Sequence, residues 1–447
     1  MKAVPLLGHA SLEEIFAWRT DGPVSVRQFL ADAMALAECL PDGTHQLNVC
    51  QDRYRFTVGL AAGLLRRKLS LQPASQSAET LRQVQAACPD VYCLCDGEFD
   101  TLDLPRLDYP SELAARPEAV NGIPAIPADF AAVQLFTSGS TGAPVAHSKT
   151  WGRLVLNGRA EAERLGLLRR GHSIVGTVPA QHSYGFESTV LLALHGNSPF
   201  WSGKPFFPLD IIAALNAVPA PRLLVTTPFH LGALLASGLE LPAIDQLLSA
   251  TAPLSAQLAA EAENRCRAPL YEIYGSTESG QLASRQTTAG QEWTLLSGVQ
   301  LEQQGEDTIA CGGHVEGRVP LSDIIEILDA QRFLLHGRHA DLVNIAGKRT
   351  SLAYLNHQIA AIPGVLDAAF FLPDEESPDG ITRLCAFVVA PELNSRRLQA
   401  ELRQRIDPIF LPRPLVFMDK LPRNTTGKLP RNQLQQLYAE KVSHVGR

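Results

Sequence analysis

A run of small hydroxyl residues and glycines is the first part of the sequence whose residue types could do chemistry. It follows the apolar run 130–136 and consists of Thr137, Ser138, Gly139, Ser140, Thr141 and Gly142. Glycines let a backbone approach an anion closely, and N–H and O–H groups can then hydrogen-bond phosphate oxygens. The run predicts a phosphate-binding loop, although a flexible Ser/Gly turn would have the same composition.

The loop does not fit two other motifs. A Walker loop requires a lysine directly after its last glycine, and none follows Gly142. A nucleophile elbow centred on Ser140 requires a glycine where Ser138 stands. A serine acyl hydrolase using Ser140 is therefore disfavoured.

The loop and three later matches occur in one order and at one approximate spacing, and together they resemble the adenylate-forming superfamily. This superfamily comprises acyl-CoA synthetases, peptide-synthetase adenylation domains and luciferases. The later matches are YEIYGSTE at 271–278, the pair Asp323 and Arg338 in PLSDIIEIL and LLHGRHAD, and LPRNTTGKLPR at 421–431. The resemblance covers essentially the whole chain, and it implies an ATP-dependent acid–thiol ligase.

The resemblance implies a nucleotide-binding role for each matched residue. Thr277 would contact the α-phosphate, and Glu278 would hold Mg²⁺, which prefers carboxylate and phosphate oxygens. Tyr274, followed by Gly275, would stack near the adenine. Asp323 and Arg338 would bind the ribose hydroxyls, because a carboxylate accepts hydrogen bonds and a guanidinium donates a forked pair.

The resemblance also implies a small domain that rotates between two half-reactions. In the first, Lys428 would contact the acid carboxylate and the bridging oxygen, where a cation offsets developing charge. In the second, another face would line a tunnel for the thiol arm of CoA or phosphopantetheine. That face carries Gly347, Lys348 and Arg349.

Two positions depart from the family pattern. Val145 stands where the loop usually has a lysine, and we expect Lys149 to reach the β- or γ-phosphate instead. The usual hinge position is Ala340, followed by Asp341. These departures are also what a non-catalytic relative that only binds nucleotide would show.

The residues expected around the acid lie after apolar runs in the middle of the chain. His182 matches a position that gates the thiol tunnel in relatives, and the pocket candidates are Tyr184, Phe229, His230, Ala250 and Thr251. Aromatic walls with polar tips suit an aryl acid such as 4-hydroxybenzoate, and they would also accept a short or medium-chain fatty acid. The segment 48–74 resembles small ligases of aryl-polyene and xanthomonadin pathways, which implies an acyl carrier protein as acceptor.

The elements that must position these residues alternate between helical and strand patterns. Helices are expected at 24–39, 57–68, 78–87, 211–217 and 230–237, and strands at 47–50, 91–94, 130–136, 173–178 and 222–226. This alternation predicts an α/β fold with a large N-terminal domain of layered sheets and helices, residues 1–339. Residues 340–447 are expected to form a small, basic α+β domain, which the resemblance implies is mobile, with strands at 364–372 and 384–389 and a helix at 395–406.

Composition excludes several other classes of protein. Hydrophobic residues make up 45% and charged residues 19%, which predicts a folded chain with a large core. The net charge of −7 argues against general nucleic-acid binding. The early apolar run 56–65 is too short to span a bilayer, and its basic end 66–68 is expected to be solvated. Eight cysteines without a completed zinc pattern indicate free thiols in the cytoplasm.

Overall fold

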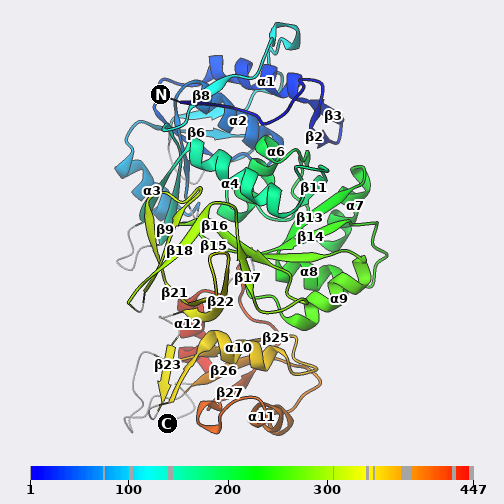
Figure 1. Ribbon diagram of the computed structural model, residues 1–447, viewed down its shortest axis with the longest axis vertical. Coiled ribbons are helices and arrows are strands. Elements are labelled where there is room, and N and C mark those ends of the chain that lie inside the picture. Colours follow the sequence, from blue (N-terminus) through cyan, green and yellow to red (C-terminus); the bar gives the residue numbers. More distant parts are fainter. Residues whose placement is uncertain are drawn as a thin grey trace.

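The computed structural model describes residues 2–73, 76–99, 104–138, 144–305, 307–338, 342–345, 348–373, 384–424 and 429–441. Within these ranges the chain forms a large α/β unit followed by a small α+β unit, which confirms the predicted fold class (Figure 1). The small unit lies at one end of the molecule. The predicted boundary at 339–340 falls outside the described residues and stays a prediction.

The first sheet of the large unit has six strands in the order β10-β9-β5-β4-β6-β7. Only β10 runs antiparallel to its neighbour. Parallel neighbours need long crossover connections, which explains why helical and apolar segments alternate in the sequence. The strands are β4 (His45–Asn48), β5 (Leu69–Gln72), β6 (Val91–Cys95), β7 (Arg106–Asp108), β9 (Ala131–Ser138) and β10 (Pro144–Thr150).

The second sheet has eleven strands in the order β21-β22-β17-β16-β15-β14-β13-β11-β12-β2-β3. The run from β15 to β2 is parallel, so the loops after these strands meet at one edge. The parallel strands are β2 (Ile15–Arg19), β11 (Ser173–Gly176), β12 (Phe200–Trp201), β13 (Arg222–Thr226), β14 (Gln246–Ser249) and β15 (Leu270–Ser276). The antiparallel ones are β3 (Gly22–Ser25), β16 (Gly280–Arg285), β17 (Trp293–Leu295), β21 (Asp323–Ile327) and β22 (Arg332–Arg338).

Both faces of the large sheet are covered. Leu223 and Val225 of β13 belong to the core shared with the first sheet, whereas Leu224 packs in a second core. The helices at the first core are α1 (Val26–Cys39), α2 (Arg53–Leu65), α4 (Trp151–Arg164), the π-helix η2 (Phe186–Leu191) and α6 (Leu192–His195). Those at the second core are α7 (Pro208–Ala217), α8 (Pro228–Ala236) and α9 (Ala256–Cys266). Helix α3 (Ala78–Ala87) packs on the outer side of the first sheet.

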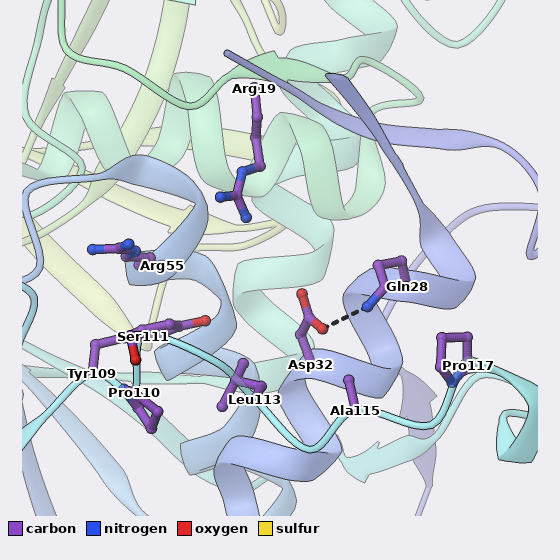
Figure 2. A pocket seen from close by; sticks show the side chains of 10 residues that line it. All are labelled: Arg19, Gln28, Asp32, Arg55, Tyr109, Pro110, Ser111, Leu113, Ala115 and Pro117. Carbon is purple, nitrogen blue, oxygen red and sulfur yellow. Dashed lines mark hydrogen bonds between the residues drawn. The ribbon is translucent and has the colours of Figure 1, made fainter. Parts of the chain in front are cut away.

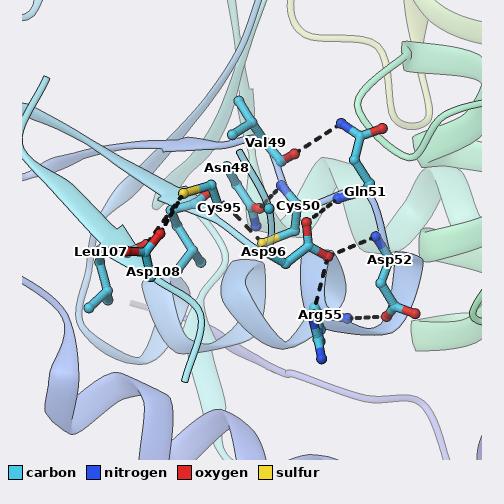
Figure 3. A network of polar contacts seen from close by, with 12 residues as sticks. Asn48, Val49, Cys50, Gln51, Asp52, Arg55, Cys95, Asp96, Leu107 and Asp108 are labelled. Carbon is cyan, nitrogen blue, oxygen red and sulfur yellow. Dashed lines mark hydrogen bonds and ion pairs between the residues drawn. The ribbon is translucent and has the colours of Figure 1, made fainter. Parts of the chain in front are cut away.

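Helix α2 begins four residues before the predicted start. Asp52 caps it by accepting from the backbone N–H of Arg55, and Asp96 holds the preceding loop by accepting from the N–H groups of Gln51 and Asp52 (Figure 3). The helix ends at Leu65. The expectation of a solvated basic end is wrong for Lys68, which is buried and donates to the carbonyl oxygens of Pro41 and Gly43 at 2.5 Å.

The small unit begins with a hairpin of β23 (Leu342–Ile345) and β24 (Lys348–Ser351), followed by α10 (Leu352–Ala360). The expected strands and helix correspond to β25 (Asp367–Phe371), β26 (Cys385–Val389) and α11 (Ser395–Arg403). Strand β27 (Leu415–Phe417) and helix α12 (Arg431–Lys441) were not predicted. Smaller sheets elsewhere pair β1 (Ala3–Pro5) with β8 (Ala125–Pro127), and β19 (Asp307–Gly312) with β18 (Val299–Gln304) and β20 (Arg318–Leu321).

All eight cysteines are unpaired, which agrees with the expectation of free thiols. Six of them are buried, Cys266 is half-buried, and Cys39 is exposed. Among the described residues, no helix combines the length and the apolar character needed to cross a bilayer.

Candidate active site

A tight hairpin between β15 and β16 carries Thr277 and Glu278 in its turn. The backbone N–H groups of Ser276 and Ser279 each donate to the other residue's hydroxyl oxygen at 3.2 Å. A Cβ atom on Gly275 would lie 2.3 Å from the carbonyl oxygen of Gly280, so only glycine fits there. The turn is therefore fixed at its base and presents Thr277 and Glu278 half-buried.

Glu278 lies beside the two strands that flank the predicted phosphate loop. Thr137 Oγ1 and His147 Nε2 are 2.9 Å apart, and His147 Nε2 lies 3.9 Å from Glu278 Oε1. Burial opposes ionisation of Glu278, but hydrogen bonds from its own backbone, Ser276 and Thr137, together with the charge of His147, lower the pKa of the carboxyl overall. The fold thus brings Thr137, the first residue of the predicted loop, to the YGSTE turn and keeps the Glu278 carboxylate ionised beside it.

Lys149 lies beneath this turn. Its side chain is 4% exposed, and Nζ donates to the backbone carbonyl oxygen of Glu278 at 2.6 Å. Burial lowers the pKa of Lys149, while Glu187, Glu316 and Glu278 act in the opposite direction. The expectation that Lys149 reaches a phosphate stays a prediction. The ammonium already has a partner in the backbone that carries Glu278.

A buried polar layer that sequence reasoning missed lies behind Lys149. Asn157 donates to Glu187 at 2.9 Å, and Ser188 donates to Glu161 at 2.7 Å. Burial raises the pKa of Glu187 to about 7 and that of Glu161 to about 8. The glutamate within the apolar run 184–194 could have drawn attention to this layer, because an ionisable group there must be paired or neutral. His147 had no comparable signal in the sequence.

Tyr274 and Asp323, which the resemblance assigns to the adenine and the ribose, lie in contact with each other. The tyrosine hydroxyl donates to Asp323 Oδ2 at 2.8 Å, and Asp323 stands opposite Arg338 in the β21–β22 pairing. The ring of Tyr274 packs against Trp293 and Phe333, with centroids 5.7 and 5.6 Å apart. The tyrosine thus holds the aspartate from a rigid aromatic cluster.

The residues predicted around the acid lie in the segments that follow β11, β13 and β14. His182 caps the short helix α5 (Ser183–Gly185), and its Nδ1 accepts from the N–H of Tyr184. The buried Tyr184 donates to the carbonyl oxygen of Leu248 at 3.0 Å. Ala250 is buried at the end of β14, and Thr251 follows it with φ +79°.

The other two pocket candidates lie on α8 and differ in exposure. Phe229 is 46% exposed, whereas His230 is buried and its Nδ1 lies 2.9 Å from Thr227 Oγ1. Burial lowers the pKa of His230 to about 4, so this side chain is neutral near pH 7. Two cavities are lined by other residues: one of about 440 Å³ near Trp201 and Lys204, and one of about 270 Å³ between α1 and α2. The acid pocket stays a prediction.

Several predicted residues lie outside the described residues or are described by their backbone only. The first group is Gly139, Ser140, Thr141, Gly142, Ala340, Asp341, Gly347 and Lys428. The second group is Ser138, Arg338, Lys348 and Arg349. The structure brings together Thr137, Lys149 and Glu278 at one place, and Tyr274, Asp323 and the backbone of Arg338 at the adjoining strands.

The donor set around Glu278 fits magnesium. It offers an ionised, half-exposed carboxylate and the hydroxyl of Thr137, and Mg²⁺ prefers oxygen ligands together with substrate phosphates. Glu278 would hold the ion, which would neutralise charge on a triphosphate when bound.

Comparison with known proteins identifies the family. Residues 42–330 match the AMP-binding enzyme family, and residues 356–428 match the AMP-binding enzyme C-terminal domain. The chain therefore belongs to this family of adenylate-forming enzymes and is an acid–thiol ligase by class.

Relatives and solved structures agree with this assignment. The chain is 30% identical to a 4-coumarate–CoA ligase of Rhodobacter capsulatus over 65% of this chain and 73% of the relative. It is 22% identical to a 2-succinylbenzoate–CoA ligase of Bacillus velezensis over 90% and 87%. The fold matches o-succinylbenzoate coenzyme A synthetase (MenE) from Bacillus subtilis in complex with ATP and magnesium ion. That match has a TM-score of 0.80 and 19% identity, and covers 97% of this chain and 100% of the other.

Proposed function

We propose that this enzyme activates an aryl carboxylic acid such as 4-hydroxybenzoate with ATP and passes the acyl group to a pantetheine thiol. The observation that carries the proposal is the convergence of distant segments. Thr137 lies close to Glu278 through His147. Tyr274 is part of β15, the strand that leads into the Glu278 turn, and it donates a hydrogen bond to Asp323.

In the proposed first step, a carboxylate oxygen of the acid attacks the α-phosphorus of ATP. The bond to the bridging oxygen of the β-phosphate breaks, and pyrophosphate leaves with both electrons of that bond. Thr277 contacts the α-phosphate, Glu278 provides a carboxylate for Mg²⁺, and Asp323 accepts from the ribose hydroxyls. Lys428 offsets the charge that develops at the reacting oxygens.

In the proposed second step, the thiol sulfur attacks the acyl carbon and loses its proton, and AMP leaves as the acyl–oxygen bond breaks. His182 begins the segment that leads to Tyr184, and we assign it to the entrance for the thiol arm. Gly347, Lys348 and Arg349 line the same entrance after the small domain rotates.

Two observations support an aryl acid and a carrier protein. The names of both relatives above specify aryl acids. Helix α11 exposes Arg396, Arg397 and Arg403, and a basic helix suits an acidic carrier. The proposed acceptor is an acyl carrier protein, in a pathway of the aryl-polyene type, or CoA, which the names of both relatives specify.

A pyrophosphate-exchange assay tests the first step. Incubation with labelled pyrophosphate, ATP and one acid at a time should give exchange with 4-hydroxybenzoate or a close aryl acid. The absence of exchange with every aryl and alkyl acid would leave only a nucleotide-binding relative. Preferential exchange with aliphatic acids would instead favour a fatty acyl-CoA synthetase. Mass spectrometry of products formed with CoA and with holo carrier protein then identifies the acceptor.

A further inference from the structure

A polar cavity is lined by residues that do not belong to the candidate active site. It measures about 270 Å³ and is lined by residues of β2, α1, α2 and the segment 109–117. Figure 1 shows α1 and β2 at the end of the molecule opposite the small C-terminal unit. None of the residues assigned to ATP, the acid or the thiol lines this cavity. Figure 2 shows the side chains of Arg19, Arg55, Asp32 and Tyr109 around it.

Two arginines line this cavity, and the guanidinium group of each lies over an aromatic ring. The Arg19 guanidinium carbon lies 5.1 Å from the Tyr54 ring centroid, and that of Arg55 lies 5.3 Å from the Tyr109 ring centroid. A guanidinium group within about 6 Å of a ring centroid is attracted by the face of the ring, which favours its position beside the ring. The two cations are therefore held at the cavity by aromatic contacts.

Neither guanidinium group has its donors fully used. Arg19 Nε lies 3.1 Å from the exposed Asp21, and Arg55 Nη1 lies 4.0 Å from Asp96 (Figure 3). Among the described residues, no side-chain hydrogen bond is formed by either guanidinium group. A guanidinium carries five N–H donors, so most donors at this cavity are free for a ligand.

Arg27, on the same helix as Asp32, is a useful comparison because its guanidinium group has only structural partners. It donates to Glu13 through Nε and Nη2, at 2.9 and 2.7 Å, and to the carbonyl oxygen of Val120 through Nη1 at 2.7 Å. All three of its nitrogens are used by the protein. Arg19 and Arg55 each have a single carboxylate partner instead, at 3.1 and 4.0 Å, which sets them apart as ligand-binding candidates.

The wall opposite Arg55 carries the carboxylate of Asp32 (Figure 2). Asp32 is 9% exposed and accepts from Gln28 at 2.7 Å and from Tyr54 at 2.6 Å. Each oxygen of a carboxylate can accept a second hydrogen bond. The charge of Asp32 would repel a ligand that carries only a carboxylate. A ligand that also carries a hydroxyl or ammonium group could donate a hydrogen bond to Asp32. Tyr109 adds a neutral hydroxyl on the side of Arg55.

We propose that this cavity binds a small carboxylate that carries a hydroxyl or ammonium group next to its carboxyl group. Arg19 and Arg55 bind the carboxylate, and Asp32 accepts from the neighbouring donor. The volume lies just below the range of about 300–1,000 Å³ typical of ligand pockets, which suits a compact acid rather than a nucleotide. The proposal concerns binding only and does not rest on the proposed reaction.

Three four-carbon acids that differ at one position test the proposal. Isothermal titration calorimetry with the full-length protein should show saturable binding of L-malate or L-aspartate, which carry a hydroxyl and an ammonium group. Succinate, which carries neither, should bind roughly tenfold more weakly, as expected for the loss of one hydrogen bond to a charged group. Whichever of malate and aspartate binds more tightly identifies the donor.

Variants locate the site. Arg19→Gln and Arg55→Gln should each weaken binding of the preferred acid roughly tenfold to a hundredfold, whereas Arg169→Gln, at an exposed arginine outside the cavity, should leave it unchanged. ATP binding measured on the same samples should not change. Arg19 and Arg55 lie on different elements, so one variant still tests the site if the other does not fold. The proposal is overturned if none of the three acids binds, if succinate binds as well as malate and aspartate, or if binding survives both substitutions.

Discussion

At the scale of single residues, Lys149 offers the sharpest test of the site because it contacts the backbone of Glu278 rather than its carboxylate. Lys149→Met keeps a long side chain and removes the donor. We expect the turn to lose its anchor, and the Mg²⁺ concentration needed for half-maximal ATP binding to rise roughly tenfold to a hundredfold, as for other groups that orient metal ligands. Calorimetric titration of ATP at a series of Mg²⁺ concentrations measures this shift.

Two comparisons separate this role from direct contact with a phosphate. Glu278→Gln should produce the same kind of shift, and the double variant should add little, because the two residues act through one turn. Lys420→Met, at an exposed lysine of the small unit, serves as the control. If Lys149→Met weakens ATP binding equally with and without Mg²⁺, the lysine contacts the nucleotide instead.

Glu161 makes stability depend on pH. Its folded-state pKa of about 8 lies above the ordinary value of 4.5, so the folded protein keeps a proton that the unfolded chain releases between these values. The free energy of unfolding should therefore fall as pH rises from about 4.5 to about 8. Glu161→Gln should flatten this decline, since the amide oxygen can still accept from Ser188. Urea unfolding at pH 6 and pH 8 checks it, and equal slopes in both proteins would contradict the assignment.

At the scale of elements, the sequence predicts segments whose pattern is local. The bounds of α3 and β13 coincide with the predicted ranges, because helical periodicity or a continuous apolar run marks each of them. The prediction started α2 too late because Arg53, in its first turn, is charged and therefore does not continue the apolar pattern. In the structure Arg53 is nevertheless buried, and it donates to the carbonyl oxygens of Gly176 and Val178. Strand β27 has only three residues, too few for a period to show.

The residues of the candidate site likewise fall into those that the sequence predicts and those that only the structure reveals. Motif residues such as Tyr274 and Asp323 could be named from the sequence, and the structure places them in hydrogen-bond contact. His147 and Glu187 could not be named, because their surroundings come from strands and helices distant in the chain. Burial and partner are properties of the fold, and no spacing rule in one sequence specifies them.

Helix α11 is the element on which the choice of acceptor can be tested. Arg396 and Arg397 are exposed in its first turn. Replacing both by glutamate should lower kcat/KM for an acidic carrier protein roughly tenfold at low salt, mainly through slower association. Turnover with CoA, which does not need the helix, should hardly change. Raising the salt concentration should reduce the difference between variant and parent, and equal losses with both acceptors would argue against a carrier-docking surface.

At the scale of the whole molecule, the described residues connect the two units through β22. Helix α10 of the small unit contacts β22 of the large one, and Ser351 donates to the carbonyl oxygen of His336 at 3.2 Å. The core of the small unit is built from its own strands and helices. A core of its own is what a domain needs to rotate as a rigid body.

Rotation predicts that Lys428 serves only one half-reaction. Lys428→Ala should reduce acyl-adenylate formation by at least about a hundredfold, as for loss of a group that stabilises transition-state charge. Thioester formation from synthetic acyl-AMP should remain within about twofold of the parent enzyme, because the lysine has then turned away. Single-turnover measurement of each half-reaction separates the two effects, with Lys420→Ala as the matched control. Equal losses in both half-reactions would mean that one arrangement of the two units serves both steps.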